Sequence, residues 1–274
     1  MGKNWFITGA SAGFGLEFVR AAAARDDRVV ATSRKPGDLE KLVADLGRGV
    51  RVVGLDVTDK NACETTLREA RDWLGSLDVV VNNAGYGQFG RVEELSEADC
   101  RDQMEVNFFG ALWLTQAALP IMRAQGAGHI VQISSVGGVC AFPGIGVYHA
   151  SKWALEGISD ALSQEVAPFG IKVTIVEPGP FRTKWGHDNA RFATPLPDYV
   201  DKYGNQEEQR AATSGGEPGD PRSAAEALLT VVDADEPPLR VLFGGPANDI
   251  APRIYQSRLA VWEEWAPVGR NTDY

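Results

Sequence analysis

Short runs of apolar residues alternate with longer segments of helical periodicity through the first two-thirds of the chain. The short runs are rich in β-branched residues, which is typical of buried strands. The longer segments repeat apolar residues at three- and four-residue intervals, as helices do when one face covers a sheet. The predicted strands are Trp5–Thr8, Arg28–Thr32, Val50–Leu55, Val79–Val81, His129–Ile133, Lys172–Val176 and Leu239–Phe243.

The segments between these strands predict the helices. The clearest are Leu16–Arg25, Lys60–Leu74, Cys100–Arg123, Tyr148–Phe169 and Arg222–Val232. A strand that alternates with a helix must run parallel to the next strand, and helices then cover both faces of the sheet. The predicted fold class is therefore α/β, a doubly wound parallel sheet in three layers, α/β/α.

Two segments depart from this alternation. Residues 191–221 are rich in Pro, Gly, Gln, Glu and Asp, so we expect a surface excursion, a lid over a substrate across about 181–221. Residues 246–274 form a C-terminal tail in which Trp262 and Trp265 are expected to pack against the body or a neighbouring subunit. The length of 274 residues suits one domain over 1–274 with this lid.

Composition excludes several functions. There are 27 basic against 37 acidic residues, a net charge of −10, which argues against nucleic acid or an anionic membrane as partner. The chain lacks an apolar run of about 18 residues, and its first turn at Thr8 leaves no room for a signal peptide. Three cysteines without metal-ligand spacing indicate a reducing compartment. We expect a soluble, cytoplasmic protein.

A glycine-rich turn joins the first strand to the first helix. Glycines permit a tight turn and a close approach of the backbone to a pyrophosphate, and the helix N-terminus attracts an anion. An ordinary glycine-rich turn is the alternative, but a preceding strand and a following helix favour phosphate binding. No Gly-Lys-Ser/Thr follows, so a dinucleotide is favoured over a nucleoside triphosphate. The candidate cofactor residues here are Thr8, Gly9, Ser11, Gly13, Phe14 and Gly15.

The end of the second strand predicts the choice of cofactor. NAD-specific sites carry an acidic residue there, whereas this chain has Ser33-Arg34-Lys35, which suits a 2′-phosphate. We therefore predict NADP(H) in preference to NAD(H), the alternative being that Arg34 and Lys35 are solvated charges. After the third strand, Asp56 and Val57 would meet the adenine, although Asp56 could equally cap the helix that starts near Asp59.

Tyr148 and Lys152 lie four residues apart at the start of a predicted helix, so both side chains share one face. A nearby cation favours the phenolate and would lower the pKa of Tyr148, which makes it a candidate acid or base. Upstream, Ser135 follows the strand His129–Ile133 and so lies at the carboxyl edge of the sheet, where ligands bind in such folds.

These motifs together resemble the short-chain dehydrogenase/reductase family, in its shorter form with one Rossmann domain, over about residues 3–185. They are the turn from Thr8 to Gly15, Asn82-Asn83-Ala84-Gly85, Asn107, Ser135, Tyr148, Lys152 and Pro178-Gly179. The resemblance implies that Tyr148 is the general acid/base, that Ser135 polarises the substrate oxygen, and that Lys152 tunes Tyr148 and holds the nicotinamide ribose. Asn107 would support a water-linked proton relay.

The same resemblance assigns further cofactor contacts. It places Asn83, Ala84 and Gly85 on the adenosine ribose side, and Pro178, Gly179 and Thr183 over the nicotinamide. No metal is expected, because His129, His149 and His187 lack ligand spacing. Cys140 lies close enough to the site to be alkylated, but a small buried side chain is the favoured interpretation.

The apolar residues expected around the site predict the chemical class of the substrate. No cluster of Arg or Lys points to a charged substrate, and the candidate wall comprises Tyr86, Phe89, Val139, Phe142, Pro143, Phe181, Trp185 and Phe192. The pattern is most similar to the 17β-hydroxysteroid and retinol dehydrogenase-like branch, which implies a hydrophobic ketone, aldehyde or secondary alcohol. The family also implies a homodimer or homotetramer built through helices 100–123 and 148–169. The alternatives are a noncatalytic NADPH-binding regulator and an epimerase or dehydratase of the same fold.

Overall fold

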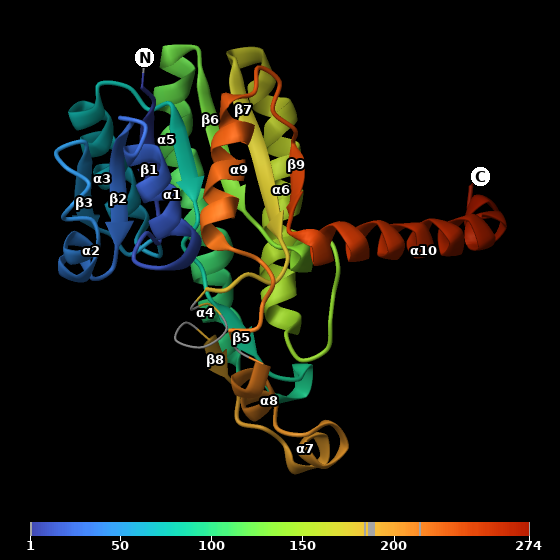
Figure 1. The fold of residues 1–274 in the computed structure, drawn as a ribbon. Helices are drawn as coiled ribbons and strands as arrows, with labels where there is room; N and C mark the ends of the chain where they lie inside the picture. The colour runs from blue at the N-terminus through green and yellow to red at the C-terminus, as the bar shows by residue number, and fades with distance from the viewer. Residues whose placement is uncertain (1, 184, 186–189, 214, 274) are drawn as a thin grey trace.

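The computed structural model describes residues 2–183, 185, 190–213 and 215–273. Within them, seven strands form a parallel sheet in the order β3-β2-β1-β4-β6-β7-β9 (Figure 1). The strands are β1 (Asn4–Ile7), β2 (Arg28–Ser33), β3 (Val50–Gly54), β4 (Val79–Asn82), β6 (Gly128–Ile133), β7 (Ile171–Pro178) and β9 (Arg240–Phe243). Every predicted strand is confirmed to within two residues at either end. The strand order reverses between β1 and β4, and ligands bind at such switch points.

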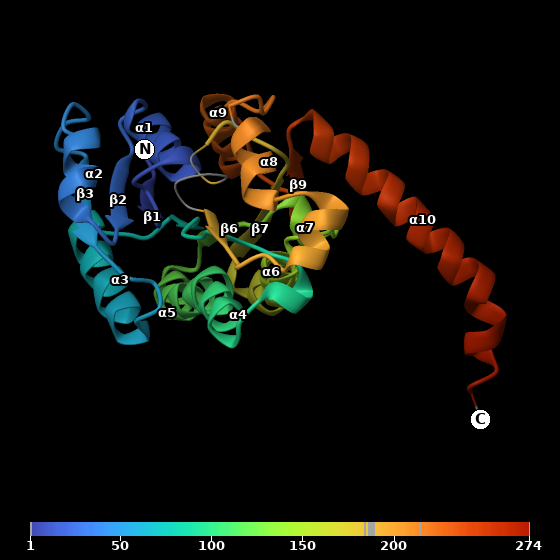
Figure 2. The same ribbon diagram turned by 90° about the horizontal axis from the view of Figure 1, so that it is seen from below.

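Helices cover both faces of the sheet, which confirms the three-layer fold (Figure 2). One face packs on α1 (Gly13–Ala23), α2 (Pro36–Leu42) and α9 (Pro221–Asp233), and the other on α3 (Lys60–Leu74), α5 (Gly110–Gln125) and α6 (Gly146–Val166). Alternation along β1 decides the faces: Trp5 and Ile7 join the first core, and Phe6 joins the second. Buried, near-continuous apolar strands are what this two-sided packing requires.

Several elements were not predicted. The predicted helix Cys100–Arg123 is composed of α4 (Glu97–Met104), a π-helical turn (Glu105–Phe109) and α5. Two short strands, β5 (Gly87–Phe89) and β8 (Ala190–Phe192), pair in parallel as a second small sheet. The segment predicted as a lid contains β8 together with α7 (Pro197–Tyr203) and α8 (Gln206–Thr213).

The predicted tail is instead one long helix, α10 (Gly245–Arg270), which projects away from the sheet and its covering helices (Figures 1 and 2). Trp262 is 65% exposed and Trp265 is 60% exposed, so neither packs against the body, and packing against a neighbouring subunit stays a prediction. Only Ala247 and Ala251 of this helix are buried, because the body ends beside its first turns. None of the helices in the described ranges is long and apolar enough to cross a bilayer.

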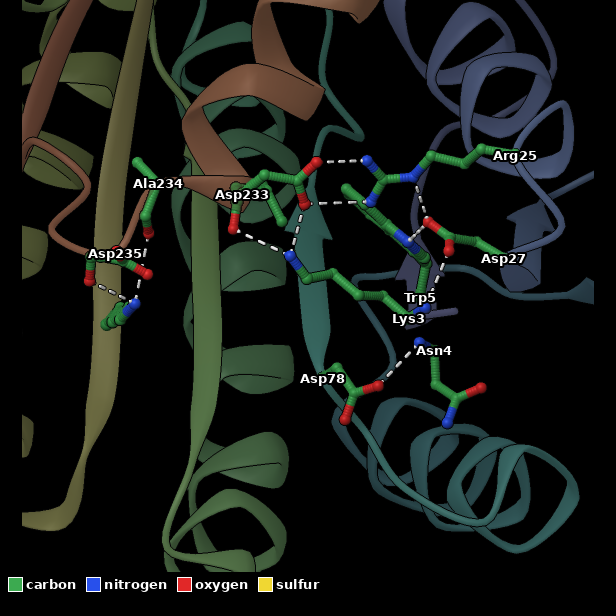
Figure 3. Close-up of polar contacts among 11 residues, drawn as sticks. Lys3, Asn4, Trp5, Arg25, Asp27, Asp78, Asp233, Ala234 and Asp235 are labelled. Carbon is green, nitrogen blue, oxygen red and sulfur yellow. Dashed lines mark hydrogen bonds and ion pairs between the residues drawn. The ribbon is translucent and has the colours of Figure 1, made fainter. Parts of the chain in front are cut away.

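A polar cluster closes the amino ends of the strands (Figure 3). The buried carboxylate of Asp27 accepts hydrogen bonds from the backbone N–H of Lys3 (2.8 Å), the indole of Trp5 (2.8 Å) and the guanidinium of Arg25 (2.6 Å). Arg25 and Lys3 also pair with Asp233 at the end of α9. The cluster therefore joins β1, α1 and α9 at the end of the sheet opposite the switch-point cavity.

Candidate active site

A cavity of about 1220 Å³ opens at the carboxyl ends of β1, β2, β4, β6 and β7. Each of these strands contributes residues at or just beyond its end, and the lining includes Gly9, Ser33, Arg34, Asn83, Ser135 and Pro178. Both partners of the predicted Tyr148/Lys152 pair also line the cavity. The structure thus brings most of the predicted site residues to one place.

The glycine turn is shaped to approach an anion closely. Gly9 and Gly13 have φ values of +63° and +55°, which non-glycine residues rarely adopt. A Cβ on Gly15 would lie 2.5 Å from the carbonyl oxygen of Gly9, so a side chain there would displace the turn. At the start of α1, Ala12 provides no side-chain cap, which leaves the first N–H groups of the helix available to a ligand.

Two of the predicted cofactor residues shape this turn and do not line the cavity. Thr8 is buried, and its hydroxyl accepts hydrogen bonds from the backbone N–H groups of Asn83 and Ala84, both at 3.0 Å. Asn83 in turn donates its side-chain amide to the carbonyls of Thr8 (2.8 Å) and Gly9 (3.1 Å). Gly15 provides the close packing described above. Thr8 and Asn83 therefore hold the ends of β1 and β4 together, and Gly15 leaves room for this contact.

The adenosine side carries a cation and a carboxylate. Arg34 is exposed at the end of β2 and has no ion-pair partner among residues 2–183, 185, 190–213 and 215–273. The Asp56 carboxylate accepts from the N–H of Thr58 (3.0 Å) and its hydroxyl (2.8 Å) and borders the cavity. The cap of α3 is Asp59, which accepts from the N–H of Ala62, so the reading of Asp56 as that cap is wrong.

Tyr148 and Lys152 occupy the first turns of α6 and are each only 6% exposed. The Nζ of Lys152 lies 5.8 Å from the centroid of the Tyr148 ring and donates to the carbonyl oxygen of Ile133 at 2.8 Å. The side chain of Ser135 lies beside Tyr148, and both residues line the cavity. Two hydroxyls and one ammonium thus share one site at the end of β6.

Burial sets the acidity of this pair. It raises the pKa of Tyr148 to about 12, an effect that the adjacent Ser135 side chain partly offsets. Burial also lowers the pKa of Lys152 to about 8, and the charge of Glu156 partly offsets that change. Burial thus dominates the pKa of Tyr148, and the expectation that Lys152 lowers this pKa stays a prediction.

Asn107 lies in the π-helical turn and is buried beside the site. Its amide donates to the carbonyl of Tyr86 (3.0 Å) and the hydroxyl of Ser151 (3.2 Å), and its oxygen accepts from the N–H of Tyr86. It therefore positions the segment that leads into β5 and the start of α6. Its part in a proton relay stays a prediction.

A buried acidic pair below Lys152 was not predicted from the sequence. Glu156 and Glu177 are 5% and 4% exposed, and Arg240 on β9 lies 3.1 Å from the Glu156 carboxylate and 3.6 Å from that of Glu177. Burial and the charge of Glu156 raise the pKa of Glu177 to about 7. A glutamate one turn after Lys152, and another inside an apolar strand just before Pro178, were the signals that could have revealed the pair.

His149 also has a role that was not foreseen. It is buried, its Nδ1 lies 2.9 Å from the carbonyl of Gly137, and its Nε2 accepts from the N–H of Phe142. Burial lowers the pKa of this imidazole, so it remains neutral and connects both ends of the loop after Ser135.

The substrate side of the cavity is mostly aromatic. The Trp185 ring lies 4.9 Å from that of Tyr148 and 5.6 Å from that of Phe89. Phe192 stacks behind Phe89 and Val139 packs against α10, so neither lines the cavity. The lining found at the predicted positions comprises Tyr86, Phe89, Phe142, Pro143, Phe181 and Trp185.

Two arginines that were not predicted, Arg191 and Arg210, also line the cavity, and Arg191 is paired with Asp102. The guanidinium of Arg210 stacks on Phe89 (4.7 Å) and lies 5.9 Å from the Trp185 ring. Its Nε is buried and finds no hydrogen-bond partner in the described part of the chain.

Neither cysteine nor histidine chemistry emerges from these residues. Cys140 is fully buried, in agreement with the favoured interpretation of a small core side chain, and burial raises the pKa of its thiol. No group of three potential metal ligands occurs among the described residues, and His187 lies outside them.

A doubly wound sheet with a phosphate cradle and a buried Tyr-Lys pair at its carboxyl edge defines a Rossmann-fold oxidoreductase. The family model described as short chain dehydrogenase matches residues 3–192, and the chain belongs to that family.

Individual relatives agree with this assignment. The oxidoreductase BOA17 of Botryotinia fuckeliana is 41% identical over 97% of each chain, and a 3-ketodihydrosphingosine reductase of Bacteroides thetaiotaomicron is 36% identical over 87% of this chain and 86% of that protein. A short-chain dehydrogenase from Streptomyces avermitilis has a TM-score of 0.92 and 41% identity, covering 100% of both chains. An alcohol dehydrogenase from Thermococcus sibiricus, complexed with 5-hydroxy-NADP, has a TM-score of 0.73 and 26% identity over 87% of this chain and 94% of that one.

Proposed function

We propose that the protein is an NADP(H)-dependent oxidoreductase that interconverts a hydrophobic ketone or aldehyde with its alcohol, with Tyr148 as general acid/base. The observation that carries this proposal is that Tyr148, Ser135 and Lys152 line one cavity at the edge that also holds the glycine cradle. A protein that only binds the nucleotide has no need for this proton-transfer group, which counts against the regulator alternative.

The residues of the cavity fit a nicotinamide dinucleotide. Gly9 and Gly13 allow close approach of a diphosphate to the N-terminus of α1, and the Thr183 side chain lies 3.3 Å from where a Cβ on Gly13 would stand. Bound there, the dinucleotide supplies hydride transfer to or from its nicotinamide ring. Pro178 and Gly179 line the cavity beside Ser135, where they would cover that ring.

The proton path follows from the environment of Tyr148. A pKa of about 12 keeps the phenol protonated until a strongly basic oxygen, such as that of a reduced carbonyl, is present to accept the proton. The hydroxyl of Ser135 would donate to the same substrate oxygen and stabilise the charge that develops on it. The ammonium of Lys152, close behind the Tyr148 ring, would favour the phenolate that remains.

The wall of the cavity supports an apolar substrate. Trp185, Phe89 and Phe142 surround the approach to Tyr148, and we infer that residues 181–221 act as the lid of a single domain. Arg210 is the polar exception in this wall, so a substrate with an acceptor group on an otherwise apolar body would fit best. The similarity to a 3-ketodihydrosphingosine reductase also favours a long apolar ketone.

Absorbance at 340 nm tests the reaction. We expect a panel of hydrophobic ketones to consume NADPH with the wild type, and Tyr148→Phe to retain NADPH binding while losing about 10²- to 10⁴-fold in kcat. Equal rates for both proteins would overturn the role of Tyr148. Activity confined to small charged ketones would overturn the substrate class.

A separate pair of variants tests the choice of NADP(H). Arg34→Ala should lower kcat/KM for NADPH about tenfold and leave NADH almost unchanged, because a charge-assisted hydrogen bond to the 2′-phosphate is lost. Arg48→Ala is the matched control, since Arg48 is an exposed arginine outside the cavity. An unchanged NADPH:NADH ratio in Arg34→Ala would contradict the assignment.

A further inference from the structure

The face by which α10 docks on the body is a regular apolar seam. Ala247 and Ala251 are buried, Ile254 packs against the same cluster, and Arg258 donates to the carbonyl of Val139 at 2.8 Å. These positions are separated by four, three and four residues, which is the spacing of a helix that packs along one side against a partner.

The seam continues where the body ends. Val261, Trp265 and Val268 extend the same alternation of three and four residues, yet they are 52%, 60% and 59% exposed. Trp262 and Leu259, beside them on the helix, are 65% and 57% exposed. An apolar face of this size on a projecting helix is typical of an interaction surface.

Charge decides which occupant fits this surface. The helix carries three arginines and three carboxylates, Arg253, Arg258, Arg270, Asp249, Glu263 and Glu264, so it has no excess of positive charge to hold an anionic lipid surface. The net charge of the whole chain is −10, which adds repulsion from such a surface. A protein partner with a matching apolar seam therefore fits better than a membrane.

A second copy of the chain provides that seam. Six exposed side chains of the outer half, from Tyr255 to Val268, present on the order of 600 Å² per copy, since large aromatic residues bury roughly 150–250 Å² each. Two copies would bury on the order of 1,200 Å², which is the lower limit for a stable, specific interface.

The position of the body fixes the direction of pairing. The body occupies the seam side of the inner half of α10, so a parallel pair would force the two bodies into the same space. An antiparallel pair keeps them at opposite ends and follows from a two-fold axis across the helix. The tip of one helix then reaches the exposed Trp153 on the other copy, which stacks under Arg258 at the base of α10.

We propose that two copies of this chain associate through the outer halves of α10, packed antiparallel so that Val261 of one copy faces Trp265 of the other. This interface is distinct from the pairing through helices 100–123 and 148–169 that the family resemblance implies. It also bears on the site, because the inner half of α10 packs against the loop of Val139 and Cys140 behind the cavity residue Phe142.

The mass in solution tests the interface. Light scattering coupled to size exclusion should give an assembly whose mass halves in the double variant Val261→Asp/Trp265→Asp, whether the wild type is a dimer or a larger assembly. The control double variant Gln256→Asp/Ala260→Asp changes the opposite face of the same helix and should keep the wild-type mass. These positions are exposed, so Tm and NADPH affinity should stay at wild-type values in both.

An unchanged mass in the seam variant would overturn the proposal, and so would a monomeric wild type at high concentration. A wild type that is monomeric but floats with vesicles of phosphatidylcholine and phosphatidylserine would identify a lipid surface as the occupant instead. Because mass is read without substrate, failure here leaves the proposed enzymatic function untouched.

Cross-linking tests the direction. In a Cys100→Ser background, where Cys63 and Cys140 are buried, a mixture of Val261→Cys and Trp265→Cys single variants should form more disulfide dimer than either variant alone. Efficient cross-linking of Val261→Cys with itself, without gain in the mixture, would show a parallel pair and overturn the antiparallel arrangement.

Discussion

The two ends of the central sheet differ in whether their polar groups are paired. At the amino ends, Asp27 satisfies three donors and Asp233 is paired with two cations (Figure 3). At the carboxyl ends, buried polar atoms remain without a hydrogen-bond partner within the described residues, among them Ser134 Oγ, Glu156 Oε1, Glu177 Oε1 and Arg210 Nε. Polar groups are satisfied at one end, whereas unpaired ones remain at the other at some cost to stability, and of these Ser134 and Arg210 line the cavity.

This contrast predicts that substitutions at the amino end lower stability and spare activity, while those at the carboxyl end do the reverse. Asp27→Ala should show the largest effect on folding, about 3–5 kcal/mol in the free energy of unfolding, because the partly buried Arg25 guanidinium and the Trp5 indole lose a buried acceptor. Urea unfolding measures this. Asp233→Ala is the control: it removes a half-exposed carboxylate and should cost less than about 1 kcal/mol. Equal losses in the two variants would contradict the contrast.

Ser135→Ala tests the carboxyl end. We expect kcat/KM to fall about 10²- to 10³-fold, because a donor to the developing oxyanion is lost. The free energy of unfolding should change little, since Ser135 contributes only one local cap to the turn that follows it. Ser163→Ala, on the same helix as Tyr148 but far from the cavity, should leave both quantities unchanged. A Ser135→Ala enzyme that is unstable but active would reverse the assignment.

Glu177→Gln tests how the free energy of unfolding depends on pH at the carboxyl ends of the strands. The folded-state pKa of Glu177 is raised from 4.5 to about 7, so its contribution to stability is full below pH 4.5 and is lost as the pH rises through 7. That shift corresponds to roughly 3 kcal/mol, since one pKa unit is about 1.4 kcal/mol. Denaturant midpoints at pH 5 and pH 8 should therefore differ less in the variant than in the wild type. The same pH dependence in both would show that Glu177 is not the titrating group.

The smallest expected effect concerns the lid. Arg210→Met should lower kcat/KM about tenfold for a ketone that carries a carboxylate and leave a neutral ketone of equal length almost unchanged, because only the former pairs with the guanidinium. Steady-state rates on the two substrates measure this difference. Lys202→Met, exposed on α7 outside the cavity, is the control. A similar loss for both ketones would mean that Arg210 only supports the aromatic wall.

The sheet and most of the cavity could be predicted from the sequence, because both depend on local signals. Apolar runs determine strands that are buried on both faces, and the chemistry of Tyr148, Lys152 and the glycine turn follows from short motifs. The remaining elements lack such a local signal. Pro252 and Pro267 lie inside α10, and a proline argues against a helix, while β5 and β8 are only three residues long, too short for a periodic pattern.

Electrostatics also required the structure. From spacing alone, Lys152 should acidify Tyr148, but the balance between charge and burial depends on how deeply both side chains lie. The approach of Arg240 to Glu156 and Glu177 joins β9, α6 and β7, which no local pattern relates. Contacts between such separate elements can be identified only when the order of the strands in the sheet is known.

The π-helical turn Glu105–Phe109 is a wider turn inside an otherwise continuous helix, equivalent to one inserted residue. Deleting one residue there would restore α-helical winding and close the wide turn that holds Asn107. Asn107 would then be displaced from the carbonyl of Tyr86 and the hydroxyl of Ser151, to which its amide donates at 3.0 and 3.2 Å. A single inserted residue thus sets the position of a buried amide between the segment that leads into β5 and the start of α6.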